Sequence, residues 1–234
     1  MTGAGRALTA SSHAGVVLEN VTPYRVGEHQ HAFEFHAARQ EVVVVHGAGP
    51  QITAQLHERG IPAIFVSGRR YTDPATLAFV RASLVAVGAE LSAALGPAAL
   101  HLVGDEIGLP ARRLPELGLV GEPLACRLTA VEQALEQYCI AVVTPTAVGP
   151  LNVNADEAAA ALAAGLGAAR VVFVSDVPGV YLEGAVVGRL HADDADALLG
   201  SGAFEGGIVP KLLAAVRAAR LGIRAEIGET AVVA

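Results

Sequence analysis

The 234-residue sequence has almost no lysine and no tryptophan, and charged residues make up only 17% of it. Lys211 is the only lysine among the 16 basic residues, and the 23 acidic residues give a net charge of −7 at pH 7. Such a chain has no overall positive field to attract nucleic acid or an anionic membrane, so we expect neither as a partner. A phosphorylated ligand must instead be held by local geometry.

Cysteine and uninterrupted apolar sequence are also scarce. The two cysteines, Cys126 and Cys139, are too few for a disulfide framework and lack the spacing of a metal site. The longest charge-free stretch, residues 137–155, contains two prolines and two asparagines, which argues against a membrane span. Arg6 is the only basic residue among the first twenty, and a signal peptide is not expected there. We therefore expect a cytoplasmic protein with reduced thiols.

Four side chains of metal-binding types lie close together at His29, His31, Glu34 and His36. No two of these histidines stand four residues apart, so on a helix they do not converge on one site. We expect a solvated helix face here and no metal site.

Short runs rich in valine and isoleucine alternate with segments of helical length rich in alanine and leucine, which is typical of an α/β fold. The runs lack polar alternation and therefore predict an open, mainly parallel sheet with helices on both faces. Strands are predicted at 41–45, 62–66, 99–103, 140–144, 171–175 and 224–227. Helices are predicted at 51–59, 74–95, 129–137, 156–166, 193–199 and 209–221. Residues 104–124 predict a hairpin-like segment.

Ligands of parallel α/β sheets bind beyond the carboxyl ends of the strands, so the turns after the strands are the places to search. The turn Gly47-Ala48-Gly49 leads from a strand into a helix whose free N–H groups can hold an anion, although a tight turn made for packing fits the same pattern. The segment 151–156 opens the alanine-rich helix with Asn152, Asn154 and Asp156. Ordinary helix capping accounts for one of these three polar side chains but not for all of them.

Two later turns have suitable chemistry. Ser175-Asp176 ends a buried strand, and Pro178-Gly179 then predicts a turn of type II character. Gly206-Gly207 precedes a helix that begins with a proline and Lys211. A surface lysine is usually solvated, but a compact ammonium group follows a moving phosphoryl group better than the fixed guanidinium fork of arginine does.

A pair of arginines in the segment Ser67–Asp73 follows another predicted strand. One of them, Arg69 or Arg70, can hold a carboxylate through two hydrogen bonds, and the other is expected to be solvated.

Five segments in the same order resemble the amino-acid kinase family and, within it, the acetylglutamate kinases. HGAGPQI is similar to the family's HGGGPQI loop, and SGRRYTD is similar to its NGLRVTD segment. LNVNADEAAAALAAGLGA, VVFVSDVPGVY and GGIVPKLLAAVRAARLGI resemble the remaining signatures. The resemblance covers residues 41–224. It implies a three-layer αβα sandwich in one domain over residues 1–234, with a substrate-binding lobe at 1–150, a nucleotide-binding lobe at 151–234 and a homodimeric assembly.

The resemblance also implies a reaction and the residues that perform it. ATP with Mg²⁺ would phosphorylate the side-chain carboxylate of N-acetyl-L-glutamate, giving N-acetyl-L-glutamyl 5-phosphate in arginine biosynthesis. Lys211 would stabilise the transferring phosphoryl group and Asp156 would orient that lysine. The substrate would be bound by Gly47, Ala48, Gly49, Arg70, Asn152 and Asn154. The nucleotide would be bound by Ser175, Asp176, Val177, Gly179, Val180, Tyr181, Gly206 and Gly207.

One departure from the family concerns the rate. The family's first strand ends in Lys-x-Gly-Gly, and spacing from His46 places Ser12 where that lysine stands. Loss of a cation at the phosphoryl group is expected to lower the rate by about 100-fold, by analogy with removal of one transition-state donor. Two alternatives follow. The chain could be a kinase-like binding or regulatory subunit, or a relative that acts on carrier-bound aminoadipate.

Overall fold

The computed structural model describes residues 17–21, 32, 36–37, 40–175 and 177–234. Ser12, Asp176 and three of the four metal candidates, His29, His31 and Glu34, lie outside the described residues. The fourth candidate, His36, places its Nε2 atom 2.7 Å from the carbonyl oxygen of Tyr138.

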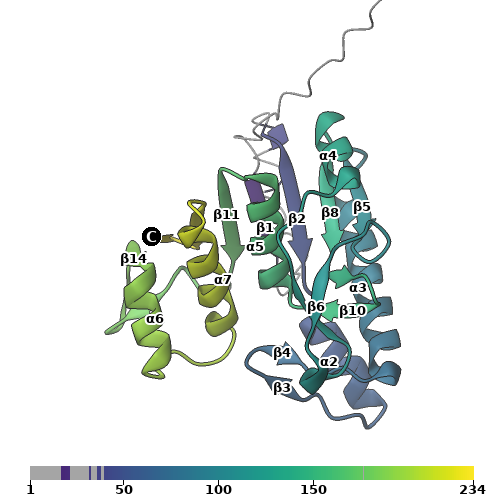
Figure 1. Ribbon diagram of the computed structural model, residues 1–234, viewed down its shortest axis with the longest axis horizontal. Coiled ribbons are helices and arrows are strands. Elements are labelled where there is room, and N and C mark those ends of the chain that lie inside the picture. Colours follow the sequence, from purple (N-terminus) through teal and green to yellow (C-terminus); the bar gives the residue numbers. More distant parts are fainter. Residues whose placement is uncertain (1–16, 22–31, 33–35, 38–39, 176) are drawn as a thin grey trace, which may run out of the picture.

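An eight-stranded sheet forms the centre of the described chain (Figure 1). Its neighbouring strands are parallel except for the antiparallel pair β15 and β16, so the predicted open, mainly parallel sheet is confirmed. From edge to edge the strands are β14 (Arg189–His191), β16 (Thr230–Val233), β15 (Arg224–Ile227), β11 (Arg170–Val174), β1 (Val17–Val21), β2 (Val42–His46), β8 (Ile140–Thr144) and β5 (Ala99–Val103).

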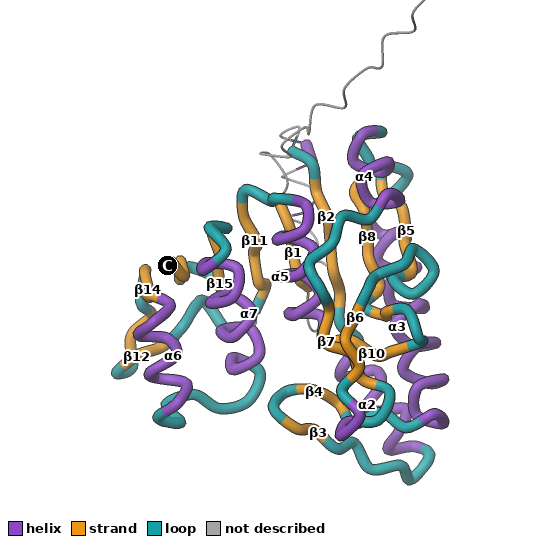
Figure 2. Tube along the Cα trace, in the orientation of Figure 1, coloured by secondary structure: helices purple, strands orange, loops and turns teal. Residues whose placement is uncertain are grey.

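Alternate residues of the central strands contribute to two different cores, which is why these runs contain no polar alternation. In β2, Val42 and Val44 pack with Leu91 and Leu95 on one face of the sheet. Val43 and Val45 belong to the larger core on the other face, which includes residues of α4, α5 and α7. Figure 2 shows α5 in front of the central strands. The three-layer αβα sandwich is therefore confirmed.

All six predicted helices are present, and each boundary lies within two residues of its predicted place. They are α2 (Gly49–Glu58), α3 (Pro74–Leu95), α4 (Thr129–Glu136), α5 (Ala155–Leu166), α6 (Ala192–Gly200) and α7 (Ile208–Arg220). The start of α3 is fixed by Asp73, whose Oδ1 atom accepts a hydrogen bond of 2.7 Å from the Thr76 amide, and by Pro74 in the first turn.

By length and composition, α3 is long and apolar enough to cross a membrane, and it is the one such helix in the described part of the chain. Core helices of soluble proteins meet the same criteria. In this fold Leu84 and Val87 of α3 pack with α2, and Leu91 and Leu95 pack on the sheet. Arg81 forms ion pairs with the two acidic residues that follow β5.

The prediction of a buried parallel strand at 62–66 is wrong. Only Phe65 and Val66 form a strand, β3 (Phe65–Val66), which pairs antiparallel with β4 (Arg69–Arg70) in a separate hairpin. The two turn residues, Ser67 and Gly68, have φ angles of 48° and 77°. Positive φ at both central residues gives the two-residue turn that favours a hairpin, so local turn chemistry outweighs the apolar run.

Further short strands lie apart from the central sheet. The hairpin-like segment predicted at 104–124 is confirmed, because β6 (Ala111–Arg113) pairs antiparallel with β7 (Val120–Pro123) around a single 3₁₀ turn. A four-stranded sheet contains this pair together with β10 (Leu151–Val153) and β9 (Thr146–Ala147). A second small hairpin joins β12 (Tyr181–Leu182) to β13 (Ala185–Val186).

Candidate active site

The carboxyl ends of β2, β8 and β11 lead into the lining of one cavity of about 620 Å³. Because β2 and β8 are parallel neighbours and β11 is parallel to the rest, their carboxyl ends lie at the same edge of the sheet. Three helices, α2, α5 and α7, also begin at this cavity, with Gly49, Ala155 and Ile208 in its lining. The start of a helix carries partial positive charge, so the cavity suits a ligand with several negative charges.

Most of the predicted site residues are brought together in this cavity. Its lining includes Gly47, Ala48, Gly49, Arg70, Asn152, Asn154, Asp156, Ser175, Val177, Gly179, Tyr181, Gly207 and Lys211. Among the described residues, two predicted ones are not in the lining. Val180 is fully buried in the core, and its amide donates a 2.8 Å hydrogen bond to Thr230. Gly206, with a φ of 68°, precedes α7 at the edge of the cavity wall.

Lys211 is buried rather than solvated. Its side chain is 7% exposed, and its Nζ atom lies 3.0 Å from Oδ1 of Asp156, whose side chain is 6% exposed. The two residues come from the first turns of α7 and α5. A buried ammonium group held by a carboxylate in the wall of a cavity is a fixed positive charge that a bound anion can approach.

Arg70 is a second buried cation in the same wall, with 6% of its surface exposed. Its Nη2 atom donates to Oγ1 of Thr53 at 2.8 Å and to the carbonyl oxygen of Gly49 at 3.2 Å, and the guanidinium lies 4.5 Å from the centre of the Phe65 ring. Its Nη1 atom is buried and has no hydrogen-bond partner among the described residues. Burial lowers the pKa of this guanidinium from its ordinary value. A carboxylate of a ligand would satisfy the unpaired donor.

The two asparagines before α5 have different hydrogen-bond partners. Asn154 caps α5, since its Oδ1 atom accepts a 3.1 Å hydrogen bond from the amide of Glu157. Asn152 does not cap the helix. Its Nδ2 atom donates to Oγ1 of Thr72 at 3.1 Å, and that hydroxyl donates to the carbonyl oxygen of Arg70 at 2.8 Å. Capping therefore accounts for Asn154 alone, as the sequence indicates.

The expectation that one arginine of SGRRYTD is solvated is wrong. Arg69 has a side chain only 18% exposed, and its Nη2 atom lies 2.8 Å from Oε1 of Glu157. Its Nε atom donates to the other oxygen of the same carboxylate at 3.2 Å. Arg69 and Arg70 are successive residues of a strand, so they point to opposite sides of the hairpin, and each finds partners there.

The expected type II turn at Pro178-Gly179 is also wrong, because that turn needs a positive φ at Gly179 and the residue has none. Glycine is required there for space instead. A Cβ atom at Gly179 would lie 2.7 Å from Oγ1 of Thr230 and 2.7 Å from a methyl group of Val186. The cavity wall at Gly179 is thus packed directly against Thr230 and Val186.

Ala48 does not need the positive φ that favours glycine. Its φ is −141°, so the position of the family's second glycine accepts a residue with a Cβ atom here. Before the loop, the fully buried His46 places its Nε2 atom 3.1 Å from Oγ1 of Thr144, which lies 2.8 Å from Nε2 of His101. Burial lowers the pKa of His46 from 6.5 to about 4, so this support of the loop is neutral at physiological pH.

Several residues of the site were not found from the sequence. Thr53 and Phe65 hold the guanidinium of Arg70, Thr72 holds Asn152, and Glu205 lines the cavity near the start of α7. The apolar run predicts Phe65 in a buried strand. The others carry no local signal, because their roles depend on contacts between distant segments.

Ser12 does not follow the first described strand. β1 begins at Val17, beyond Ser12, and its last residue Val21 pairs with His46. The expected Ser12 position therefore precedes β1 and lies outside the described residues. The lack of a second lysine does not depend on that placement, since Lys211 is the only one in the sequence.

Known proteins are similar to this chain over most of its length. Residues 30–229 match the model of the Amino acid kinase family. The acetylglutamate kinase of Roseiflexus castenholzii is 40% identical over 201 residues, which cover 81% of this chain and 78% of that protein. The acetylglutamate kinase of Listeria monocytogenes is 32% identical over 220 residues, covering 89% and 87% of the two chains. A solved structure from Streptococcus mutans has a TM-score of 0.86 at 23% identity and covers 94% of this chain and 99% of that one.

Proposed function

This chain belongs to the amino acid kinase family, and from that membership we propose that it phosphorylates N-acetyl-L-glutamate with ATP. The product is N-acetyl-L-glutamyl 5-phosphate, an acyl phosphate of arginine biosynthesis. The names of the relatives support this substrate. The observation that carries the proposal is the single cavity that joins Arg70, whose Nη1 donor is free among the described residues, to the buried pair of Lys211 and Asp156.

The acceptor binds on the Arg70 side of the cavity. The Nη1 donor of Arg70 pairs with the α-carboxylate of the acceptor, while Thr53 and the Phe65 ring keep the guanidinium in place. Asn152 lines the same wall and binds the amino-acid end of the acceptor. The amides of Ala48 and Gly49, at the start of α2, lie beside the acceptor carboxylate and the phosphoryl group that it receives.

The nucleotide binds on the side built from the end of β11 and the start of α7. Ser175, Val177, Gly179 and Tyr181 line this side, and Gly207 leads into the first turn of α7. The positive end of the α7 dipole and the ammonium group of Lys211 present positive charge to the phosphates. Asp156 holds the ammonium group at 3.0 Å and so fixes the direction from which it acts.

The chemistry needs charge neutralisation more than proton transfer. A side-chain carboxylate oxygen of the acceptor attacks the γ-phosphorus, a new O–P bond forms, and the bond from that phosphorus to the β–γ bridging oxygen breaks, with ADP leaving as the anion. The nucleophile is already ionised, so no general base is required. Lys211 and the helix amides stabilise the charge on the transferring group, which is the main protein contribution to phosphoryl transfer.

The donor set fits Mg²⁺ that arrives with ATP. Mg²⁺ is usually bound through one or two carboxylates together with substrate phosphates. Among the described residues, the cavity lining contains two carboxylates, those of Asp156 and Glu205. Within the described residues no group of three histidine, cysteine, aspartate or glutamate side chains is suited to hold a metal by itself. When bound, Mg²⁺ supplies further neutralisation of the phosphate charge.

A reduced rate is part of the proposal. The family motif has a lysine after the first strand and this chain has only Lys211, so a single ammonium group serves the transferring phosphoryl group. We expect turnover about 100-fold below that of the Roseiflexus castenholzii relative under the same conditions. The same shortage of lysine favours the second candidate, a subunit that binds the ligands without efficient turnover.

Trapping of the acyl phosphate with hydroxylamine distinguishes the kinase from the binding subunit. The purified chain is incubated with N-acetyl-L-glutamate, ATP and Mg²⁺, and the hydroxamate is measured against a Lys211→Met variant. The kinase predicts hydroxamate that depends on both substrates and disappears in the variant. Absence of hydroxamate from the unaltered chain, together with ATP binding by calorimetry, would reject the kinase and support the binding subunit.

A further inference from the structure

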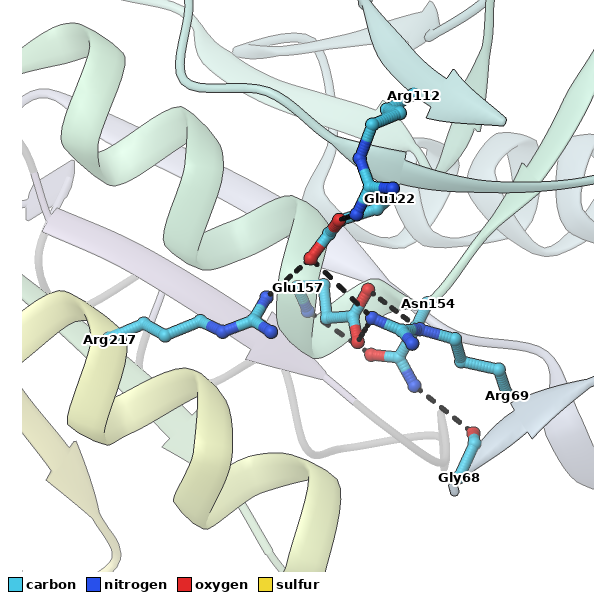
Figure 3. A network of polar contacts seen from close by, with 7 residues as sticks. All are labelled: Gly68, Arg69, Arg112, Glu122, Asn154, Glu157 and Arg217. Atoms are coloured by element: carbon cyan, nitrogen blue, oxygen red, sulfur yellow. Dashed lines mark hydrogen bonds and ion pairs between the residues drawn. The ribbon is translucent and has the colours of Figure 1, made fainter. Parts of the chain in front are cut away.

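The β3–β4 hairpin is held from two sides by its successive arginines. On one side, Arg70 donates to Thr53 and to the Gly49 carbonyl of α2. On the other side, Arg69 donates through both Nε and Nη2 to the two oxygens of Glu157 in the first turn of α5, at 3.2 and 2.8 Å (Figure 3). A paired contact of this kind fixes the orientation of the guanidinium as well as its distance.

The turn of the hairpin is fixed at the same place. The carbonyl oxygen of Gly68 accepts a 3.3 Å hydrogen bond from Nδ2 of Asn154, the residue that caps α5 (Figure 3). Gly68 also lies close to α7, because a Cβ atom built on it would be 3.2 Å from Cβ of Pro210. Pro210 directly precedes Lys211. The turn therefore lies between the amino-terminal ends of α5 and α7.

A second carboxylate extends the network to α7. Glu122 of β7 lies 3.8 Å from Nη2 of Arg69 and 3.4 Å from Nη1 of Arg217, and it also pairs with Arg112 of β6 (Figure 3). Arg217 belongs to the helix that begins near Lys211. Through Glu122 and Glu157 the hairpin is thus connected to the helices that carry Lys211 and Asp156.

The ion pairs of this network differ in burial, and the more buried pairs contribute more to stability. Arg69 and Glu157 have side chains 18% and 13% exposed, whereas those of Arg112 and Arg217 are 64% and 51% exposed. Exposed ion pairs contribute little to stability, and a largely buried pair costs far more to break because one charge is left behind. Burial also raises the pKa of Glu157, so that carboxylate depends on Arg69 to remain charged.

We propose that Arg69 is a positioning residue that holds the β3–β4 hairpin against the start of α5 and thereby holds Arg70 in the cavity. The role in acceptor binding rests on the proposed function, whereas the hold on the hairpin does not. Leucine stands at this place in the NGLRVTD segment of the family, so the tie to Glu157 is a property of this chain's own sequence.

The test compares Arg69→Leu with Arg112→Leu, which removes an exposed arginine from the same network without touching the hairpin. Amide hydrogen exchange of peptides spanning residues 64–72 is measured first, without ligands. We expect about tenfold faster exchange in Arg69→Leu, from the loss of two charge-assisted hydrogen bonds, and less than about twofold change in Arg112→Leu. Arg69→Lys, which keeps the charge but not the paired geometry, should lie between them.

Steady-state kinetics gives the second readout. Arg69→Leu should raise KM for N-acetyl-L-glutamate by about tenfold while kcat falls much less, because Arg70 is displaced and Lys211 is not. In a Glu157→Gln background the Arg69→Leu substitution should raise KM little further, because the ion pair between the two residues is already lost. Equal exchange in Arg69→Leu and Arg112→Leu would overturn the inference. Faster exchange in a chain that forms no acyl phosphate would uphold the hold on the hairpin and reject the proposed function.

Discussion

The Nζ atom of Lys211 lies 3.0 Å from Oδ1 of Asp156, and the side chains of both residues are more than nine-tenths buried. The pair joins the first turns of two helices, α5 and α7, that pack against each other beside the sheet. Burying two charges is costly unless they are paired, so each partner fixes the other. The only ammonium side chain of the protein is thereby held in the cavity wall at the starts of α5 and α7.

Replacement of Lys211 by methionine is expected to separate catalysis from stability. Turnover should fall by at least about 100-fold, as for loss of one transition-state donor. The free energy of unfolding should fall by about 3–5 kcal/mol, because the Asp156 carboxylate loses its buried cation. The double variant Lys211→Met/Asp156→Asn removes both charges and should regain most of the stability, measured by urea unfolding, without regaining turnover. Recovery of turnover in the double variant would contradict the role of Lys211.

For Arg70, in contrast, we expect substitution to weaken binding of the acceptor and to leave the free energy of unfolding almost unchanged. Arg70→Met removes a buried guanidinium whose Nη1 atom has no partner in the described structure and replaces it with an apolar chain of similar length. The free energy of unfolding should change by less than about 1 kcal/mol or rise, because an unsatisfied buried donor disappears. The KM for N-acetyl-L-glutamate should rise by about tenfold or more, since a charge-assisted hydrogen bond to the carboxylate is lost. A large loss of stability with KM unchanged would assign Arg70 a structural role only.

The sequence predicts the buried strands and the helices well because each has a strong local signal. The apolar runs of β2 and β8 have cores on both faces, and α3 has a capping aspartate and a proline at its start. The strands that were missed have no such signal. β1, with the sequence VLENV, includes Glu19 and Asn20, and β14 is a three-residue edge strand. For the segment 62–66 the apolar run is misleading, because the turn at Ser67 and Gly68 decides the structure.

The site is predicted in part for a similar reason. Residues at strand ends and helix starts, such as Asp156 and Lys211, lie in motifs that the sequence displays. The partners that hold them come from distant segments, and no periodicity of the sequence indicates such contacts. Arg69 and Glu157 are 88 residues apart in the chain, and Asn152 and Thr72 are 80 apart. A local pattern therefore labels Arg69 as solvated, although the fold buries it beside a carboxylate.

Acid should destabilise the protein partly through His46. Burial lowers the pKa of this histidine from 6.5 to about 4, so the folded state excludes a proton that the unfolded chain binds. Its contribution is complete above pH 6.5 and is lost as the pH falls toward 4. Between pH 7 and pH 4.5 the loss amounts to about 2–3 kcal/mol.

The contribution of His46 can be isolated with His46→Gln, whose amide can still bond to Thr144. Other titrating groups affect both proteins alike, so the difference in their free energies of unfolding measures His46 alone. We expect the original chain to lose about 2–3 kcal/mol more than the variant between pH 7 and pH 4.5 in urea titrations. Parallel pH profiles for the two proteins would show that the buried imidazole does not titrate in this range.

Two glycine-to-alanine substitutions in helices should have opposite effects. A Cβ atom on Gly165 of α5 would overlap the backbone of Cys126, whereas a Cβ atom on Gly200 of α6 meets nothing within 4 Å. Gly200→Ala should stabilise the fold by about 0.4–1 kcal/mol by restricting the unfolded chain. Gly165→Ala should destabilise it by about 1–3 kcal/mol or more, because backbone cannot move aside as a flexible side chain does.

Since the far end of α5 carries Asp156, a helix displaced from Cys126 also shifts the carboxylate that orients Lys211. Gly165→Ala should therefore lower kcat at temperatures where the variant is still folded, and Gly200→Ala should not. Thermal unfolding measures the stability of both variants, and acyl-phosphate trapping measures their turnover. Equal stabilities of the two variants would contradict the close contact between α5 and Cys126.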